Sequence, residues 1–361
     1  MRIRCAFVGC GGVAENYWNI YRELDWIQIT VLVDINQSAL DRAADFFSAN
    51  QPRPRTSTDF AAALADDVDV VLVNTPNHLH REQAVAALEA GKHVLLQKPI
   101  AGTLSDAYAI REAAQAARTK CGVFMSYLDQ PLFYDLAEMN RRGWFGAMVQ
   151  FYARYMHTWG LVWTEQNMRS WRGSLDKIGG GAFLQLGVHY LHLFRFISGL
   201  EPLSVVGIKD NVFCPNLDGE DIGTATFEYE TGVKATVDAA WTTDGEEISI
   251  QGTRGSVTYL ANRWLLLQGN EEPFDGEVIH TSGSKLILLE IPLFGMGVNQ
   301  PWNQHRRFLE AVRDNAPVPV SVESAVNDLV AVAAFYEATN KQSRVSLSDV
   351  AARMSLDEMI S

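Results

Sequence analysis

A lysine stands where an apolar run of the chain stops. Residues 93–102 read HVLLQKPIAG, and the run is typical of a buried strand up to Gln97. Pro99 prevents the strand from continuing, so Lys98 lies at its mouth. Desolvation penalises an amine in such surroundings unless a partner or a reaction uses its charge. Lys98 is therefore our first candidate for a functional residue.

Polar side chains recur along a second apolar run, GGGAFLQLGVHYLHLFRFISGL at residues 179–200. Gln185, His189 and His192 are four and three residues apart, which puts them on one face of a helix. Because an imidazole can accept and return a proton near neutral pH, we predict that His189 is an acid/base. Gln185 and His192 would bind neighbouring hydroxyls or pass the proton on. The alternative is that both histidines are hydrogen-bonded core residues.

A glycine-rich loop gives the first indication of a cofactor. FVGCGGVAE at residues 7–15 contains the pattern Gly9-x-Gly11-x-x-Ala14 between a predicted strand and a predicted helix. In such loops the first glycine makes a tight turn, the second lets the backbone approach a pyrophosphate, and the third position keeps the helix close to the sheet. The helix start would offer N–H groups to the phosphates. Alone the pattern is weak, because any tight turn of this kind favours glycine.

Asp34 strengthens the cofactor interpretation. It ends the second predicted strand, 22 residues after Gly12, where a carboxylate can accept a hydrogen bond from an adenosine ribose hydroxyl. The alternative role is a helix N-cap. A carboxylate repels a 2′-phosphate, and Ile35 and Asn36 supply no arginine to hold one. We therefore predict NAD and not NADP.

The segment NTPNHLH at residues 74–80 leaves the fourth predicted strand at the same edge of the sheet. Ligands of such sheets bind at this edge, so we expect the segment to border the nicotinamide. For His78 and His80 a capping and packing role is the favoured alternative. The predicted cofactor contacts are Gly9, Gly11, Gly12, Val13, Ala14, Asp34, Thr75, Pro76, Asn77, His80, Gln97 and Lys98.

The elements that carry these residues predict an α/β protein of two domains. Near-continuous apolar strands at 3–8, 28–33, 68–73, 93–97 and 122–127 alternate with helices such as 80–91 and 104–120, which is typical of a parallel sheet. We predict a Rossmann domain over residues 1–124. Residues 125–361 form an α/β domain with an open, largely antiparallel sheet, because the strands at 148–157, 223–230, 233–241 and 247–260 alternate polar and apolar residues. Helices at 179–200, 303–315 and 321–341 complete it.

Composition limits the partners. With 361 residues, 47% of them hydrophobic and 20% charged, the chain is globular, and its formal net charge of −13 disfavours nucleic acid and anionic membranes. No apolar stretch has the roughly 20 residues of a membrane helix, and the start of the chain runs directly into a strand. Four cysteines without a CxxC pair fit a reduced compartment, so we predict a cytoplasmic protein. We predict no metal site, because the histidines at 189 and 192 lack a third ligand at a convincing spacing.

The chain resembles the Gfo/Idh/MocA family of NAD(P)-dependent oxidoreductases over nearly its whole length. The resemblance rests on the glycine loop, TPNHLH, GKHVLLQKP (91–99), GGGAFLQLGVHYLHL (179–193), GTRGSV (252–257) and the helical ending. It implies a catalytic lysine, Lys98, beside the nicotinamide, a cis Lys98–Pro99 bond and a histidine, His189, on the second motif. It also implies a homodimer or homotetramer.

Three positions depart from the family pattern. Gln97 replaces a glutamate, while Gln185 and His192 replace aspartates. The loss of three anionic neighbours favours neutral Lys98 and His189, and a neutral imidazole is what a general base requires. The same losses could instead mean that the chemistry has been abandoned.

Aromatic residues near the start of the second domain indicate a carbohydrate partner, because aromatic faces pack on sugar C–H surfaces. The predicted substrate contacts are Lys98, Tyr127, Tyr155, His157, Trp171, Arg172, Gln185, His189 and His192, with Trp159 and Trp163 nearby. We predict an NAD-dependent dehydrogenase that oxidises a secondary hydroxyl of a sugar, glycoside or cyclitol, or reduces the corresponding ketone, with pyranose carbon 3 as the narrower prediction. The alternatives are redox-assisted glycoside cleavage with retained NAD and a non-catalytic NAD- or sugar-binding protein.

Overall fold

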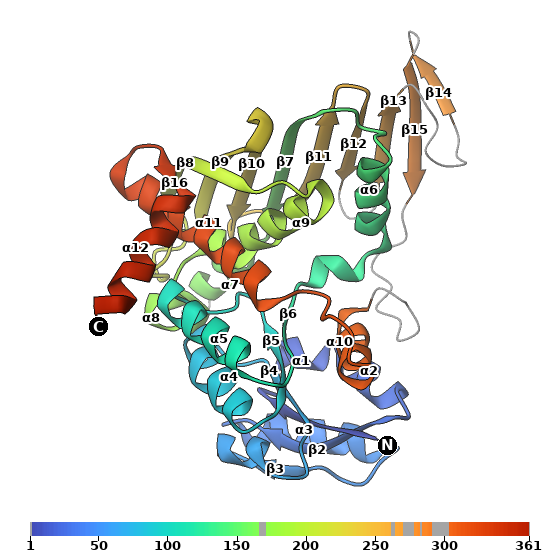
Figure 1. The fold of residues 1–361 in the computed structure, drawn as a ribbon, viewed down its shortest axis with the longest axis vertical. Coiled ribbons are helices and arrows are strands. Elements are labelled where there is room, and N and C mark those ends of the chain that lie inside the picture. The colour runs from blue at the N-terminus through green and yellow to red at the C-terminus, as the bar shows by residue number, and fades with distance from the viewer. Residues whose placement is uncertain are drawn as a thin grey trace. The chain divides into compact units, whose positions relative to one another are not determined.

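The computed structural model describes residues 2–165, 171–260, 264–269, 278–281, 284–290 and 303–360 (Figure 1). The chain divides into two compact units. The first unit comprises Met1–Asp129 and Met296–Val326, and the second comprises Gln130–Gly295 and Asn327–Ser361. The chain therefore returns to the first unit after it has formed most of the second.

The first unit is built on a six-stranded parallel sheet with the strand order β3-β2-β1-β4-β5-β6. Its strands are β1 (Ile3–Val8), β2 (Ile27–Val33), β3 (Arg55–Ser57), β4 (Val70–Val73), β5 (His93–Gln97) and β6 (Cys121–Phe124). Its helices are α1 (Gly12–Glu15), α2 (Trp18–Glu23), α3 (Gln37–Ser48), α4 (His80–Glu89), α5 (Leu104–Ala116) and α10 (Gln304–Arg313). The order reverses between β1 and β4, as in a Rossmann fold, and ligands of such sheets bind at the carboxyl ends of the strands beside this point.

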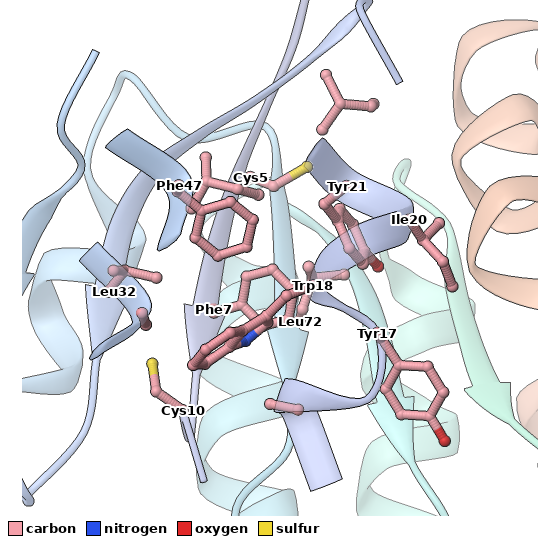
Figure 2. Close-up of a cluster of buried hydrophobic side chains, with 14 of the residues drawn as sticks. Cys5, Phe7, Cys10, Tyr17, Trp18, Ile20, Tyr21, Leu32, Phe47 and Leu72 are labelled. Carbon is pink, nitrogen blue, oxygen red and sulfur yellow. The ribbon is translucent and has the colours of Figure 1, made fainter. Parts of the chain in front are cut away.

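Aromatic packing closes one face of this sheet. The ring of Phe7 lies 4.8 Å from that of Tyr21 and 5.8 Å from that of Phe47. Figure 2 shows these side chains pointing toward one another from β1, α2 and α3. Phe308 and Leu309 of α10 belong to the same cluster and are fully buried. Their position makes α10 part of the core of the first unit. Burial of each side chain of this size favours folding by about 1.5–3 kcal/mol.

The second unit contains a ten-stranded sheet with the order β14-β15-β13-β12-β11-β7-β10-β9-β8-β16. Its strands are β7 (Met148–Met156), β8 (Pro202–Asp210), β9 (Ile222–Tyr229), β10 (Lys234–Ala240), β11 (Gly245–Gly252), β12 (Gly255–Leu260), β13 (Trp264–Gly269), β14 (Val278–Thr281), β15 (Ser284–Glu290) and β16 (Val345–Ser346). β7 and β10 pair in parallel, and the other neighbours are antiparallel. The prediction of a Rossmann domain with a largely antiparallel second sheet is confirmed.

Helices connect and follow these strands, and some of them pack against the sheet. They are α6 (Pro131–Arg141), α7 (Trp159–Glu165), α8 (Leu175–Ile178), α9 (Val188–Ser198), α11 (Val322–Lys341) and α12 (Leu347–Ile360), and a π-helical turn, η5 (Phe183–Gly187), leads into α9. Phe194 of α9 stacks on Phe151 of β7 at 4.5 Å, and Phe183 stacks on Phe335 of α11 at 3.9 Å. Within the described residues, no helix is both long and apolar enough to cross a membrane.

Candidate cofactor and catalytic sites

The glycine loop follows β1 at the carboxyl edge of the first sheet. Gly9 has φ +85°, and a Cβ there would lie 2.8 Å from the backbone carbon and oxygen of Asn74, so only glycine fits. A Cβ on Gly11 or Gly12 would meet no atom within 4 Å. The space in front of these two residues is therefore open, as the approach of a pyrophosphate requires.

Asp34 ends its strand at the same edge. Its carboxylate accepts hydrogen bonds from the backbone N–H groups of Cys10, at 2.7 Å, and Asn36, at 2.8 Å. The N-cap of α3 is Asn36, whose side chain accepts from Ser38 N, so capping is not the role of Asp34. The carboxylate is held against the glycine loop, where a ribose hydroxyl can reach it.

The helix after the loop is interrupted. α1 spans only Gly12–Glu15, and α2 begins at Trp18, with Tyr17 between them. The ring of Tyr17 is buried, 4.8 Å from that of Phe124 and 4.3 Å from that of His305. The break thus lets an aromatic ring enter the core next to the loop. The sequence predicts a helix here but gives no sign of the break.

Lys98 lies at the end of β5, and the Lys98–Pro99 peptide bond is cis, as the resemblance implies. Gln97 is buried, and its Oε1 accepts a hydrogen bond from the backbone N–H of Lys98 at 3.0 Å. The Gln97 side chain also forms a hydrogen bond with the phenol of Tyr17. Burial raises the pKa of this phenol. Gln97 therefore fastens the Lys98 turn to the interrupted helix.

His80 holds the same turn from the other side. Its Nε2 lies 2.9 Å from the carbonyl oxygen of Thr75, and its Nδ1 lies 3.1 Å and 3.2 Å from those of Pro99 and Ile100. The ring is fully buried, and burial lowers the pKa of His80. These contacts favour the packing role for His80 and link the Thr75 turn to the turn that carries Lys98.

The second motif begins with glycines that permit close packing. A Cβ on Gly181 would lie 2.1 Å from the backbone oxygen of Glu220. The Glu220 carboxylate accepts hydrogen bonds from the N–H groups of Gly181, at 3.0 Å, and Phe183, at 2.9 Å, and from the Tyr336 hydroxyl at 2.8 Å. Burial raises the pKa of Glu220. These contacts anchor the start of the π turn that positions Gln185.

The predicted catalytic helix is buried almost all round. Gln185, His189 and His192 are 9%, 5% and 5% exposed. Gln185 lies in the π turn, a feature common at functional sites, and the two histidines lie in the regular helix α9. His192 Nδ1 is 2.7 Å from the carboxylate of Asp328, a residue that the sequence analysis missed. The sequence marks Asp328 only as a lone carboxylate inside the apolar run of residues 325–335.

The predicted substrate residues of the second unit include a connected set of aromatic rings. Tyr155 lies 5.9 Å from His157 and 6.0 Å from Tyr190, the neighbour of His189. The Arg172 guanidinium stacks on Trp171 at 4.3 Å, and burial lowers the pKa of Arg172. Tyr127 is buried in the first unit. Among the described residues, no group of three histidine, cysteine or acidic side chains could hold a metal ion.

Two family models match the chain. The model of the oxidoreductase family with an NAD-binding Rossmann fold matches residues 3–125, and that of the GFO/IDH/MocA C-terminal domain matches residues 133–258. The chain belongs to the Gfo/Idh/MocA family. Its first unit is therefore an NAD-binding Rossmann domain, and the open loop at Gly11 and Gly12 fits that cofactor.

Curated Gfo/Idh/MocA relatives match parts of the chain. A 1,5-anhydro-D-fructose reductase from Ensifer adhaerens is 33% identical over 53% of this chain and 56% of its own length. A D-apiose dehydrogenase from Paraburkholderia graminis is 28% identical over 66% of this chain and 61% of its own. A glycosyl hydrolase family 109 protein from Shewanella baltica is 27% identical over 47% and 39%. The chain thus spans less than two thirds of each of these relatives.

Solved structures share the fold over nearly the whole chain. A levoglucosan dehydrogenase in complex with NADH and levoglucosan has a TM-score of 0.84 and 20% identity, covering 96% of this chain and all of its own. An aldose-aldose oxidoreductase from Caulobacter crescentus has a TM-score of 0.80 and 21% identity over 96% of this chain and all of its own. At these identities the likeness establishes the architecture.

Proposed function

We propose that the protein is an NAD-dependent dehydrogenase that oxidises, or in reverse forms, a secondary hydroxyl of a sugar, glycoside or cyclitol. The observation that carries the proposal is the position of Lys98 at the carboxyl edge of the NAD-binding sheet, with its turn fixed by Gln97 and His80. The names of the curated relatives, a reductase of anhydrofructose and a dehydrogenase of apiose, support a carbohydrate substrate.

The cofactor contacts follow from the first unit. The open backbone at Gly11 and Gly12, together with the helix start at Val13 and Ala14, would bind the pyrophosphate, and Asp34 would bind the adenosine ribose. The Thr75–Asn77 turn would border the nicotinamide. NAD, when bound, supplies the acceptor for the hydride of the alcohol carbon.

The chain itself must manage the proton and the charge on oxygen. Lys98 donates a hydrogen bond to the reacting oxygen and stabilises the negative charge that develops there, while His189 accepts the hydroxyl proton. In the reverse direction His189 returns the proton to the same oxygen. Lys98 directly follows β5, in a turn held by Gln97 and His80, and His189 lies in α9, which limits the movement of both.

The substrate would be held by the second unit. Gln185 and His192 would bind neighbouring hydroxyls or pass the proton on. Tyr155, His157 and Trp171 would pack on C–H surfaces, with Arg172 as a further donor. A pyranose carbon 3 hydroxyl is our narrower proposal, because neighbouring hydroxyls on both sides could then be bound.

A second candidate is redox-assisted cleavage of a glycoside with retained NAD. The similarity to glycosyl hydrolase family 109 proteins favours it. Such an enzyme would hold NAD tightly and release a leaving group without net production of NADH.

One experiment separates these functions. The purified protein is analysed for bound nucleotide, and the absorbance of reduced nicotinamide is followed with NAD and a panel of sugars, glycosides and cyclitols. Net reduction by one class supports the dehydrogenase. Release of the aglycone from a chromogenic glycoside without net reduction supports the cleavage reaction. Bound NAD with neither activity means that the protein only binds NAD or sugar.

We also propose a cytoplasmic location and a homodimer or homotetramer. The four cysteines are buried and free, as suits a reduced compartment. Light scattering coupled to size exclusion measures the oligomeric state, and a monomer at micromolar concentration would contradict this proposal.

A further inference from the structure

A buried ionic contact joins α9 to α11. His192 Nδ1 lies 2.7 Å from one carboxylate oxygen of Asp328, and Arg195 Nη1 lies 2.8 Å from the other. The three side chains are 7%, 0% and 9% exposed. Arg195 also forms an ion pair with the half-exposed Glu201 at 2.7 Å. Helix α11 thus places a carboxylate beside His192.

The contact determines which nitrogen of His192 carries a proton. Asp328 can only accept when ionised, so the neutral His192 ring must carry its hydrogen on Nδ1. Nε2 then has the free lone pair of a base. Arg195 pairs with the other oxygen of the same buried carboxylate, so the negative charge of Asp328 has a partner inside the protein.

His192 also lies close to the proposed base. Both histidines lie in the regular part of α9, three residues apart, and side chains with this spacing are neighbours, about 5–6 Å apart at Cβ. The Nε2 atom of a ring fixed by a carboxylate is the arrangement that enzymes use for a proton acceptor.

We propose that Asp328 is a positioning residue that makes His192 the second proton acceptor of the dehydrogenase. The inference rests on the proposed function. The hydroxyl proton taken by His189 passes to Nε2 of His192, which becomes an imidazolium paired with Asp328, while His189 returns to its neutral form. No proton is lost or gained in this transfer, and the reverse reaction draws the proton back from His192.

A purely structural role makes a different prediction. If the contact only joins two helices, loss of either partner of Asp328 reduces the amount of folded enzyme and leaves the pH dependence of the remaining activity unchanged. A role in proton transfer instead makes the pH dependence sensitive to each charge near His192. The charged and titratable groups around it are Asp328, then Arg195 and Glu201 on the far side of Asp328, the buried phenol of Tyr229 near those three charges, and the neighbouring His189 on the same helix.

The test compares Asp328→Asn with Arg195→Gln, a matched variant that breaks the same network from the other side. A carboxylate beside an imidazole favours the protonated ring and a guanidinium disfavours it. Asp328→Asn should therefore move the acidic limb of the kcat/KM profile to lower pH and reduce kcat about tenfold or more. Arg195→Gln should move that limb to higher pH. The Kd for NAD should be unchanged in both. If the acidic limb of the kcat/KM profile lies at the same pH in wild type and in both variants, the inference is overturned.

A second measurement does not require the variants to fold well. Nitrogen NMR of histidine-labelled wild type, with His192→Gln to assign the signal, reports the tautomer directly. A proton on Nδ1 is expected, and a proton on Nε2 overturns the inference. In an enzyme that reduces NAD with a sugar, unshifted limbs reject only the role of His192. Failure of every sugar to react rejects the proposed function and, with it, this role.

Discussion

Nε2 of His80 lies 2.9 Å from the carbonyl oxygen of Thr75, and the same ring contacts the turn that carries Lys98, so it joins the proposed nicotinamide border to that turn. The other nitrogen of the ring faces the carbonyl oxygens of Pro99 and Ile100. A single buried ring therefore sets the spacing between a predicted cofactor contact and a predicted catalytic residue.

The His80→Phe variant tests this coupling. Phenylalanine fills the space of the ring but donates no hydrogen bond, so buried carbonyl groups lose a donor at a cost of about 1–3 kcal/mol. We expect a lower melting temperature and a fall in kcat of about tenfold or more, because small displacements of catalytic groups are costly. His80→Gln, which keeps a donor, should retain more activity. Wild-type kcat in a folded His80→Phe protein would refute the coupling.

Removal of the proposed catalytic side chains should abolish turnover and spare the cofactor. We expect Lys98→Ala and His189→Ala each to reduce kcat by at least about a hundredfold, the scale of a lost acid/base group. The Kd for NAD, measured by fluorescence titration, should change little. Lys98→Arg and His189→Gln serve as matched variants that keep a donor. Equal activity of both alanine variants and wild type would remove the mechanism.

The same substitution should have different effects at two glycines of the cofactor loop. Gly9→Ala places a methyl group 2.8 Å from the Asn74 backbone at φ +85° and should lower the free energy of unfolding by about 1–3 kcal/mol. Gly11→Ala meets no atom within 4 Å, so its stability should match wild type. Its Kd for NAD should rise about tenfold or more, since the methyl group occupies the pyrophosphate's space. Denaturant unfolding and NAD titration of both variants decide the matter.

Acid should destabilise the first unit through His305. Its Nδ1 lies 2.7 Å from the Tyr21 hydroxyl in an apolar cluster, and burial lowers the pKa of His305 to about 3. The unfolded chain binds this proton near pH ~6.5. The contribution to stability is therefore complete above that pH and is lost toward the folded-state pKa, by about 1.4 kcal/mol per unit. His305→Phe should show a flatter decline in urea unfolding between about pH 7 and 5, and an unchanged slope would contradict this assignment.

Asp129 should act in the opposite direction. Burial raises its pKa to about 7, although its carboxylate accepts a hydrogen bond from Gln304 N at 2.7 Å. An exposed aspartate titrates near ~3.9, so the folded chain holds an extra proton between these values. The stability that Asp129 contributes is complete below the unfolded-state pKa and is lost as pH rises through the folded-state pKa. Asp129→Asn removes this term, so its unfolding free energy should fall more steeply on acidification than that of wild type. If the unfolding free energies of Asp129→Asn and wild type change with pH in parallel, this role of Asp129 is refuted.

The sequence predicted the elements whose signal is local. Five of the six strands of the first sheet, the glycine loop and Asp34 follow from short patterns, and the loop and Asp34 lie at one edge of this parallel sheet. β3 was missed because it has three residues and an exposed pattern that no hydrophobic run marks. The π turn before α9 was missed because a one-residue change of helical period leaves no local signature.

The contacts that the sequence could not predict are long-range. Asp328 is 136 residues from His192, and nothing in either local pattern names the other. Glu220 and Tyr336, which fasten the glycines of the second motif, are 116 residues apart. The residues of the second motif could be predicted from the sequence. The residues that contact them could not, because those contacts depend on how distant helices pack.

The return of residues 303–326 to the first unit also bears on how the protein is made. Phe308 and Leu309 fill the core around β1, and Ser321 pairs with Gly122 beside β6. A ribosome delivers these residues only after it has synthesised Gln130–Gly295. During translation the core of the cofactor unit therefore stays incomplete until residues 303–326 have been synthesised, long after its own strands have left the ribosome.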